Sequence, residues 1–245
     1  MKQETIDKVE AALADWDFLG KLPEEHAGFH FSVQKTVTGE SQDMYDIFAY
    51  DKPAAHQCVT AYFHEETQEY KLRIRTGFIE FCRIECITGD LAVFTQMLDA
   101  QLLHVLDGLA HFDPASLSAM VREKHILEWP RAKELPETLE GYTLFVRPTA
   151  PVKITNGSYI IIDYADFDHG CGVTIYYNIY RDEFFGEARV HAIPDVSYEF
   201  DSKTLDDLGK RLDDRLIPRL RWARKAADEV TKSKNYEVTR KDLTI

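Results

Sequence analysis

The stretch that decides the fold occurs twice in the chain. Residues Leu98–Leu106 read LDAQLLHVL, and residues Leu212–Leu220, 114 positions later, read LDDRLIPRL. The same offset aligns Val59–Phe63 with Val173–Tyr177. A match between distant parts of one chain indicates an internal duplication. The matching unit is about as long as a small domain, so we expect two similar lobes rather than a solenoid.

The duplication predicts how the chain is divided. We expect a first repeat lobe over residues 1–112, a second repeat lobe over 113–230 and a polar C-terminal tail over 231–245. Two copies of one unit in a single chain resemble a symmetric homodimer whose subunits have been fused. We therefore predict a pseudo-dimer with an approximate two-fold axis.

Hydrophobic spacing in the first copy predicts a helix, a sheet and a second helix. Apolar residues recur every three or four positions over Thr5–Phe18, with Thr5 as a candidate cap, and again over Leu91–Leu109, with Asp90 in the first turn. Between these helices lie runs rich in aromatic and β-branched residues, separated by short turns that favour antiparallel pairing. The predicted strands are 29–33, 44–50, 58–64, 70–76 and 79–86.

The second copy repeats this pattern. An opening helix that begins at Asp113-Pro114 is expected to contain Met120, Ile126 and Trp129. A closing helix follows from Leu205, with Pro218 inside it, and we expect a kink near Asp214 to Pro218. The predicted strands are 142–146, 159–164, 173–180, 184–193 and 196–200. The fold class is therefore α+β, with each copy built as a helix, a five-stranded antiparallel meander and a helix.

Composition limits the function. The 245 residues include 42 acidic and 29 basic side chains, giving a net charge of −13, which disfavours a general electrostatic attraction to nucleic acid or to an anionic membrane. Four unevenly spaced cysteines do not form a disulfide framework, and the N-terminal residues lack the apolar core of a signal peptide. We expect a cytoplasmic protein without a membrane segment, whose partner is another protein.

Two groups of residues carry side chains suited to chemistry. Residues 163–171, DYADFDHGC, place three aspartates, His169 and Cys171 in one predicted turn, where a metal site competes with an ordinary solvated loop. Cys58 lies between His56 and His64, but we do not predict a catalytic role for it. Cys82 and Cys86 are expected on one face of a strand, too far apart for a disulfide. The sequence predicts no cofactor and no catalytic or metal-binding residue.

The candidate binding surface combines aromatic and basic residues. Adjacent aromatics in a strand point to opposite faces, so some of them either form an exposed platform or are buried between the lobes. The closing helix of the second copy carries arginines one turn apart, which either meet a partner or pair with neighbouring aspartates. The surface comprises Tyr62, Tyr176, Tyr177, Tyr180, Arg211, Arg215 and Arg219.

In the order of its predicted elements, the chain resembles two kinds of protein. One is the small, acidic helix-sheet-helix proteins that act as secretion chaperones and bind other polypeptides. The other is the tandem single-stranded nucleic-acid binders of the Whirly and Pur type. We expect a non-enzymatic binding module for a protein partner, with single-stranded nucleic-acid binding as the alternative. An enzyme with its site in the cleft between the lobes is the second alternative, and the residues favour no enzyme.

Overall fold

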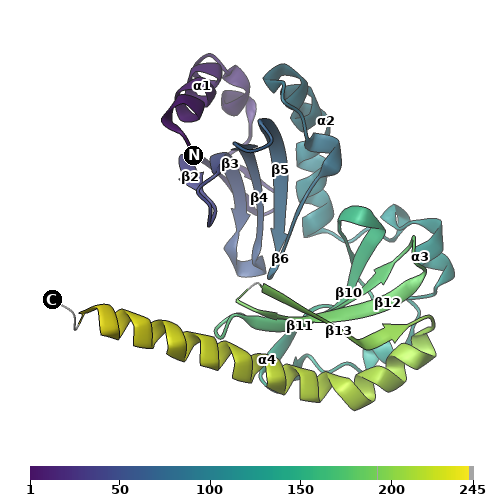
Figure 1. Cartoon of the computed structure of the whole chain (residues 1–245). Helices are drawn as coiled ribbons and strands as arrows, with labels where there is room; N and C mark the ends of the chain where they lie inside the picture. Colours follow the sequence, from purple (N-terminus) through teal and green to yellow (C-terminus); the bar gives the residue numbers. More distant parts are fainter. Residues whose placement is uncertain (192, 243–245) are drawn as a thin grey trace. The chain divides into compact units, whose positions relative to one another are not determined.

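The computed structural model describes residues 1–191 and 193–242, and the side-chain surroundings of these residues except Asn156 and residues 233–242. The chain forms two compact units, Met1–Phe112 and Asp113–Ile245. Each unit contains helices and one antiparallel sheet, of six strands in the first unit and seven in the second (Figure 1). The predicted α+β class is confirmed. In the described part of the chain, no helix combines the length and the apolar character needed to cross a membrane.

The first unit is a meander between two helices. Its strands pair in chain order, β1 to β6, each antiparallel to the next (Figure 1). Very short connections, such as the turn between β4 and β5, force this arrangement because a parallel crossover needs many more residues. The elements are α1 (Gln3–Ala14), η1 (Asp17–Lys21), β1 (Glu25–His26), β2 (Phe29–Thr38), β3 (Met44–Lys52), η2 (Pro53–Ala55), β4 (Gln57–His64), β5 (Glu69–Thr76), β6 (Ile79–Cys82), η3 (Ile84–Cys86) and α2 (Leu91–Ala110).

Both long helices of the first unit pack on the same face of its sheet. Alternate strand residues point toward them, because successive side chains of a strand face opposite sides. Val9 and Leu13 of α1 share one core with Phe94 and Leu98 of α2. The strand residues of this core include Tyr45, Ile47, Tyr50, Val59, Ala61, Phe63, Tyr70, Leu72 and Ile74.

Several element ends in the first unit differ from the predictions. The first helix ends at Ala14 rather than Phe18, and the strand expected over 29–33 extends to Thr38. The first helix begins at Gln3, so Thr5 is not its cap, and the Thr5 hydroxyl donates to Glu65 instead. Asp90 is the cap of α2 rather than part of its first turn, since its carboxylate accepts from the backbone N–H groups of Ala92 and Val93. The predicted strand 79–86 ends at Cys82.

Because β6 ends at Cys82, the prediction that Cys82 and Cys86 share one strand face is wrong. Cys86 belongs to the 3-10 helix η3 and is fully buried, whereas Cys82 is half-buried and its sulfur lies 3.3 Å from the Tyr62 hydroxyl. The chain leaves the sheet at Arg83, which sequence alternation alone did not reveal.

The second unit also contains an antiparallel sheet, which is followed by one very long helix. Its strands pair in the order β13-β12-β11-β10-β8-β7, and the short β9 pairs beside β8 on β10. The elements are η4 (Pro114–Ser116), α3 (Ala119–Glu123), η5 (Pro130–Lys133), β7 (Thr138–Leu139), β8 (Tyr142–Val146), β9 (Val152–Lys153), η6 (Thr155–Gly157), β10 (Ser158–Asp166), β11 (Cys171–Asn178), β12 (Glu183–Val190), β13 (Ile193–Ser202) and α4 (Leu205–Asp242).

The predicted opening helix of the second unit is not continuous. The chain forms the short helix α3, capped by the Ser118 hydroxyl, and then turns before η5. The helix ends at Glu123, and His125 takes a positive φ of 54°, which a continuing helix excludes. Pro130 then keeps Trp129 out of a helical conformation. Ile126 and Trp129 are nevertheless buried, which is why their spacing resembled a helix.

Helix α4 runs through Pro218 without a break and continues to Asp242. Residues 231–242 of the predicted tail are therefore helical, and 243–245 lie outside the described residues. The kink expected near Asp214 to Pro218 stays a prediction. The apolar stripe of the helix is buried against the second sheet and comprises Leu208, Leu212, Leu216, Leu220 and Ala223.

Neither sheet has the predicted five strands. The two-residue strands β1, β7 and β9 are too short to show any alternation in the sequence. The predicted strand 184–193 ends at Val190, and Ile193 already belongs to β13. Ala192 of that prediction lies outside the described residues.

Candidate functional site

The sheet of the first unit has a polar face opposite its helices. Along β4, Val59, Ala61 and Phe63 point into the core, so the alternate residues lie on the other face. Pairing with the neighbouring strands extends this face in cross-strand rows, because Cys58 lies between Asp51 and Arg75, and Thr60 lies between Ala49 and Arg73. The alternate residues of β4 are Cys58, Thr60, Tyr62 and His64.

This polar face is hollowed by a groove of about 370 Å³. Five strands contribute to its lining, and among the lining residues only Ala49 and Cys58 are not strongly polar. Most small-molecule pockets are predominantly apolar, so the groove is suited to a polar ligand. It is lined by Ser32, Gln34, Asp46, Ala49, Asp51, Cys58, Thr60, Arg73, Arg75 and Glu80. We call this surface the polar groove.

Arg73 is fixed at one end of the polar groove. Its guanidinium donates to both carboxylate oxygens of Asp46, at 3.3 and 3.2 Å, and lies 5.1 Å from the centre of the Tyr62 ring. Glu80 lies 3.7 Å away on the more exposed side. Burial raises the pKa of Asp46 above its ordinary value, although the charge of Arg73 acts in the opposite direction. Arg73 and Asp46 therefore form a rigid wall rather than a free binding group.

Arg75 is the accessible cation of the polar groove. Its side chain is 54% exposed, and its nearest carboxylate, that of Asp51, lies 3.9 Å away and is 42% exposed. An exposed ion pair at that distance contributes little to stability. A ligand carboxylate can therefore replace Asp51 as the partner of Arg75 at small cost.

Burial dominates the surroundings of the Cys58 thiol, although Thr60 and Arg75 act on its pKa in the opposite direction. Burial raises the pKa of its thiol above the ordinary value, so the reactive thiolate is disfavoured. Its sulfur lies 3.5 Å from the Thr60 hydroxyl, which is a weak hydrogen-bonding partner and not a base. His64 lies six residues further along the strand, roughly 20 Å away by the rise of a β-strand. Cys58 and His64 therefore do not form a catalytic pair.

The predicted tyrosines do not form one exposed platform. Tyr62, Tyr176 and Tyr177 are at most 5% exposed, whereas Tyr180 is 78% exposed. The hydroxyls of Tyr176 and Tyr177 donate to Glu187 and Asp182, both at 2.7 Å. These bonds explain how adjacent tyrosines are tolerated on the two faces of β11.

The predicted arginine row of α4 mainly holds the edge strand β13. Arg211 donates to the carbonyl oxygen of Glu199 at 3.1 Å, and Arg219 donates to the carbonyl oxygen of Asp195 at 3.0 Å and pairs with its carboxylate. Arg215 is exposed and has no partner among the described residues. Two of the three arginines are thus occupied within the unit, which does not support a phosphate-binding row.

The side chains of the loop 163–171, where a metal site competed with a solvated loop, make three separate contacts. Asp163 is buried and accepts a hydrogen bond from the Thr174 hydroxyl at 2.8 Å, and its burial raises its pKa to about 7. Asp166 instead pairs with His169 and with Arg224 of α4. The sulfur of Cys171 lies 3.1 Å from the Tyr142 hydroxyl. Among the described residues, these side chains do not converge on a common point.

Sequence reasoning missed the polar groove because its residues are scattered over five strands. The sequence does show polar residues that alternate with buried ones along each strand. In β5, for example, Arg73 and Arg75 alternate with Leu72, Ile74 and Thr76. Such residues are ordinarily solvated, and only strand register shows which of them are neighbours. Comparison of the chain with protein-family models, curated proteins and solved structures finds no match.

Proposed function

We propose that the protein is a non-enzymatic binding module and that the polar groove binds a charged, polar segment of a protein partner. The observation that carries the proposal is the groove itself, on the sheet face that α1 and α2 leave uncovered. A sheet face whose polar residues only kept the protein soluble would not need to be concave or to hold paired charges. Burial raises the pKa of the Cys58 thiol, which supports binding rather than covalent chemistry at this site.

The charges of the polar groove define the partner segment. Arg75 is available to a carboxylate, because its bond to Asp51 is long and exposed. Asp51 and Glu80, once released from arginine, accept hydrogen bonds from donors of the bound segment. We therefore expect a segment with an acidic side chain next to basic or amide groups. Arg–carboxylate contacts of this kind give geometric specificity as well as binding energy.

Panning a displayed peptide library against the immobilised full-length protein tests this function. The enriched peptides should contain an acidic residue, and the Arg75→Glu variant should lose their binding because the carboxylates then repel each other. Lys21→Glu is the matched control, since it makes the same charge change at an exposed residue of η1. Peptides that bind Arg75→Glu as well as the unaltered protein, or a library without enrichment, would exclude the polar groove.

We also propose that the two units arose by tandem duplication. The equal spacing of their elements supports this proposal: β4 and β11 each have eight residues, from Gln57 and Cys171, which are 114 positions apart. The same spacing separates Leu91 and Leu205, where α2 and α4 begin. The β-bulges that follow Asp46 in β3 and Ile160 in β10 also correspond.

Experimental coordinates of the two units test the duplication. Residues 13–109 and 126–223 should superpose with each strand of one unit on its counterpart, apart from the short β9. Superposition that required a different strand order or a shift in register would contradict a common origin. The approximate two-fold relation between the units remains part of this proposal.

A further inference from the structure

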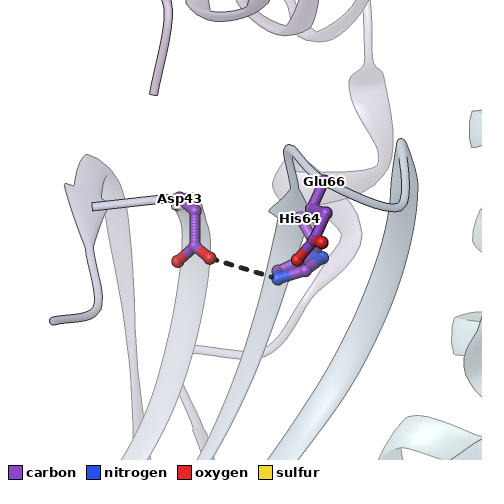
Figure 2. Close-up of side chains that lie close together, drawn as sticks. All are labelled: Asp43, His64 and Glu66. Atoms are coloured by element: carbon purple, nitrogen blue, oxygen red, sulfur yellow. Dashed lines mark ion pairs between the residues drawn. The ribbon is translucent and has the colours of Figure 1, made fainter. Parts of the chain in front are cut away.

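Three side chains that commonly bind metals meet at one end of the first sheet. Asp43 directly precedes β3, His64 is the last residue of β4, and Glu66 lies in the turn that follows (Figure 2). One ligand atom from each of the three side chains lies within 4.8 Å of the others. This is the one such convergence of three or more histidine, cysteine or acidic side chains in the described part of the chain.

The backbone fixes this arrangement. Met44 pairs with His64 in the β3–β4 ladder, which places Asp43 beside the turn that carries Glu66. The backbone N–H of Glu65 donates to the carbonyl oxygen of Asp43 at 2.8 Å and continues the pairing beyond the strands. Asp43 and His64 are therefore held by sheet register, and Glu66 is carried by the turn that directly follows β4.

The spacing of the ligand atoms fits a small cation. Asp43 Oδ2 and His64 Nε2 are 3.5 Å apart (Figure 2). Two ligands bound tetrahedrally to Zn²⁺ at about 2.0–2.1 Å are roughly 3.3 Å apart. Figure 2 shows the Glu66 carboxylate beside the same imidazole ring. Small side-chain rotations thus bring all three groups to coordination distance.

The surrounding charges leave this cluster with surplus negative charge. Glu65 is already engaged by the N-terminal ammonium and by Thr5, and Glu69 pairs with Lys71 at 3.2 Å. In contrast, Glu66 has no hydrogen bond or ion pair among the described residues. Asp43 and Glu66 thus place two carboxylates beside a single imidazole, which a divalent cation would neutralise.

A neighbouring hydroxyl orients the histidine. His64 Nδ1 lies 3.1 Å from the Thr67 hydroxyl, on the opposite side of the ring from Asp43. Histidines that bind metals commonly donate their second N–H to a neighbouring oxygen, which fixes the tautomer and the ring orientation. The backbone N–H of Thr67 also donates to Nδ1, at 3.4 Å, so zinc binding at Nε2 requires the tautomer that carries its proton on Nδ1 and donates it to the Thr67 hydroxyl instead.

We propose that Asp43, His64 and Glu66 form a Zn²⁺ site with one open coordination position. One imidazole and two carboxylates suit zinc, whereas calcium and magnesium prefer oxygen ligands alone. Three protein ligands leave a fourth position for water or for a group of a bound molecule. His64 and Tyr62 lie on the same face of β4 as the polar groove, so this position borders that face. The inference does not rest on the proposed function of the groove.

Calorimetric titration of the untagged full-length protein with zinc chloride tests the site. We expect one saturable site, with affinity lowered at least about tenfold in both His64→Gln and Glu66→Gln. Glu66→Gln keeps the test meaningful if His64→Gln folds poorly, because Glu66 is exposed and makes no contact that supports the fold. The matched control is His26→Gln, which removes a histidine that lies 2.8 Å from the Asp107 carboxylate without a third ligand.

Three results would overturn the proposal: no saturable zinc binding to the unaltered protein, unchanged affinity in either ligand variant, or equal loss in His26→Gln. Calcium and magnesium chloride serve as competing probes, and displacement of zinc by a comparable concentration of either would contradict the assignment to zinc. Substitution with Co²⁺ gives a second readout, since its visible spectrum should appear in the unaltered protein and disappear in Glu66→Gln.

Discussion

The hydroxyl of Tyr50 donates a hydrogen bond to the carbonyl oxygen of Pro23 at 2.7 Å. Tyr164 forms the same bond with Pro136 at 2.8 Å in the second unit. Each tyrosine side chain is fully buried, and burial raises the pKa of both hydroxyls to about 12. Each bond ties a central strand to the segment that precedes the first strand of its sheet.

The two tyrosine hydrogen bonds should stabilise their units by similar amounts. We expect Tyr50→Phe and Tyr164→Phe each to lower the free energy of unfolding of its own unit by about 1 kcal/mol, because the proline carbonyl loses its donor. Urea denaturation followed by fluorescence measures the change. Tyr180→Phe is the control, since that side chain is 78% exposed and should change the free energy very little. Unequal effects of the two buried substitutions would weaken the equivalence of the units.

The cap of α2 offers a second prediction. The carboxylate of Asp90 accepts hydrogen bonds from the backbone N–H groups of Ala92 and Val93, at 2.8 and 3.0 Å. Asp90→Ala should therefore lower the free energy of unfolding by about 1 kcal/mol. Asp99→Ala removes the same charge from an exposed position inside the helix and should not destabilise it. Thermal unfolding distinguishes the two, and equal melting temperatures would contradict the cap.

Asp163 should make stability depend on pH. Its pKa is raised to about 7 by burial, so the folded protein holds a proton that the unfolded chain releases near pH 4. The contribution of Asp163 to the free energy of unfolding is therefore complete below pH 4 and is lost as the pH rises toward 7. Asp163→Asn keeps an oxygen for the Thr174 hydroxyl and removes the charge. It should stabilise the protein at pH 8, by on the order of 2–4 kcal/mol.

The pH profile of unfolding checks this prediction. The difference in unfolding free energy between Asp163→Asn and the unaltered protein should grow between pH 4 and pH 7 and then level off. A difference that stays constant over this range would show that Asp163 does not titrate in it. Thr174→Val serves as a comparison, because it removes the hydroxyl donor while leaving the carboxylate in place.

Sequence patterns predicted the regular parts of this fold. The stripe from Leu91 to Leu109 marks α2 almost to the residue, because an apolar stripe packed on a sheet keeps helical spacing. Two kinds of element were missed. The strand β1 has two residues, which is too few for a period. The helix expected through Ile126 and Trp129 ends at Glu123 instead, shortly before His125, whose φ is positive. In both cases burial or strand pairing depends on distant parts of the unit.

The candidate sites were less predictable than the fold. Asp43 and His64 are 21 positions apart, and only the pairing of β3 with β4 brings their side chains together. The residues that stood out in the sequence have other uses, since Asp163 is buried and Arg219 holds β13. Strand register was therefore a better guide to the candidate sites than the local density of reactive side chains in the sequence.

The central claim is that Arg75 in the polar groove receives an acidic side chain of a bound segment. A double-mutant cycle measures this contact most directly. A selected peptide and its Asp→Asn or Glu→Gln analogue are each titrated calorimetrically into the unaltered protein and into the Arg75→Gln variant. We predict a coupling free energy of at least about 1 kcal/mol between Arg75 and the acidic residue. A coupling of zero, with both substitutions acting independently, would contradict the account.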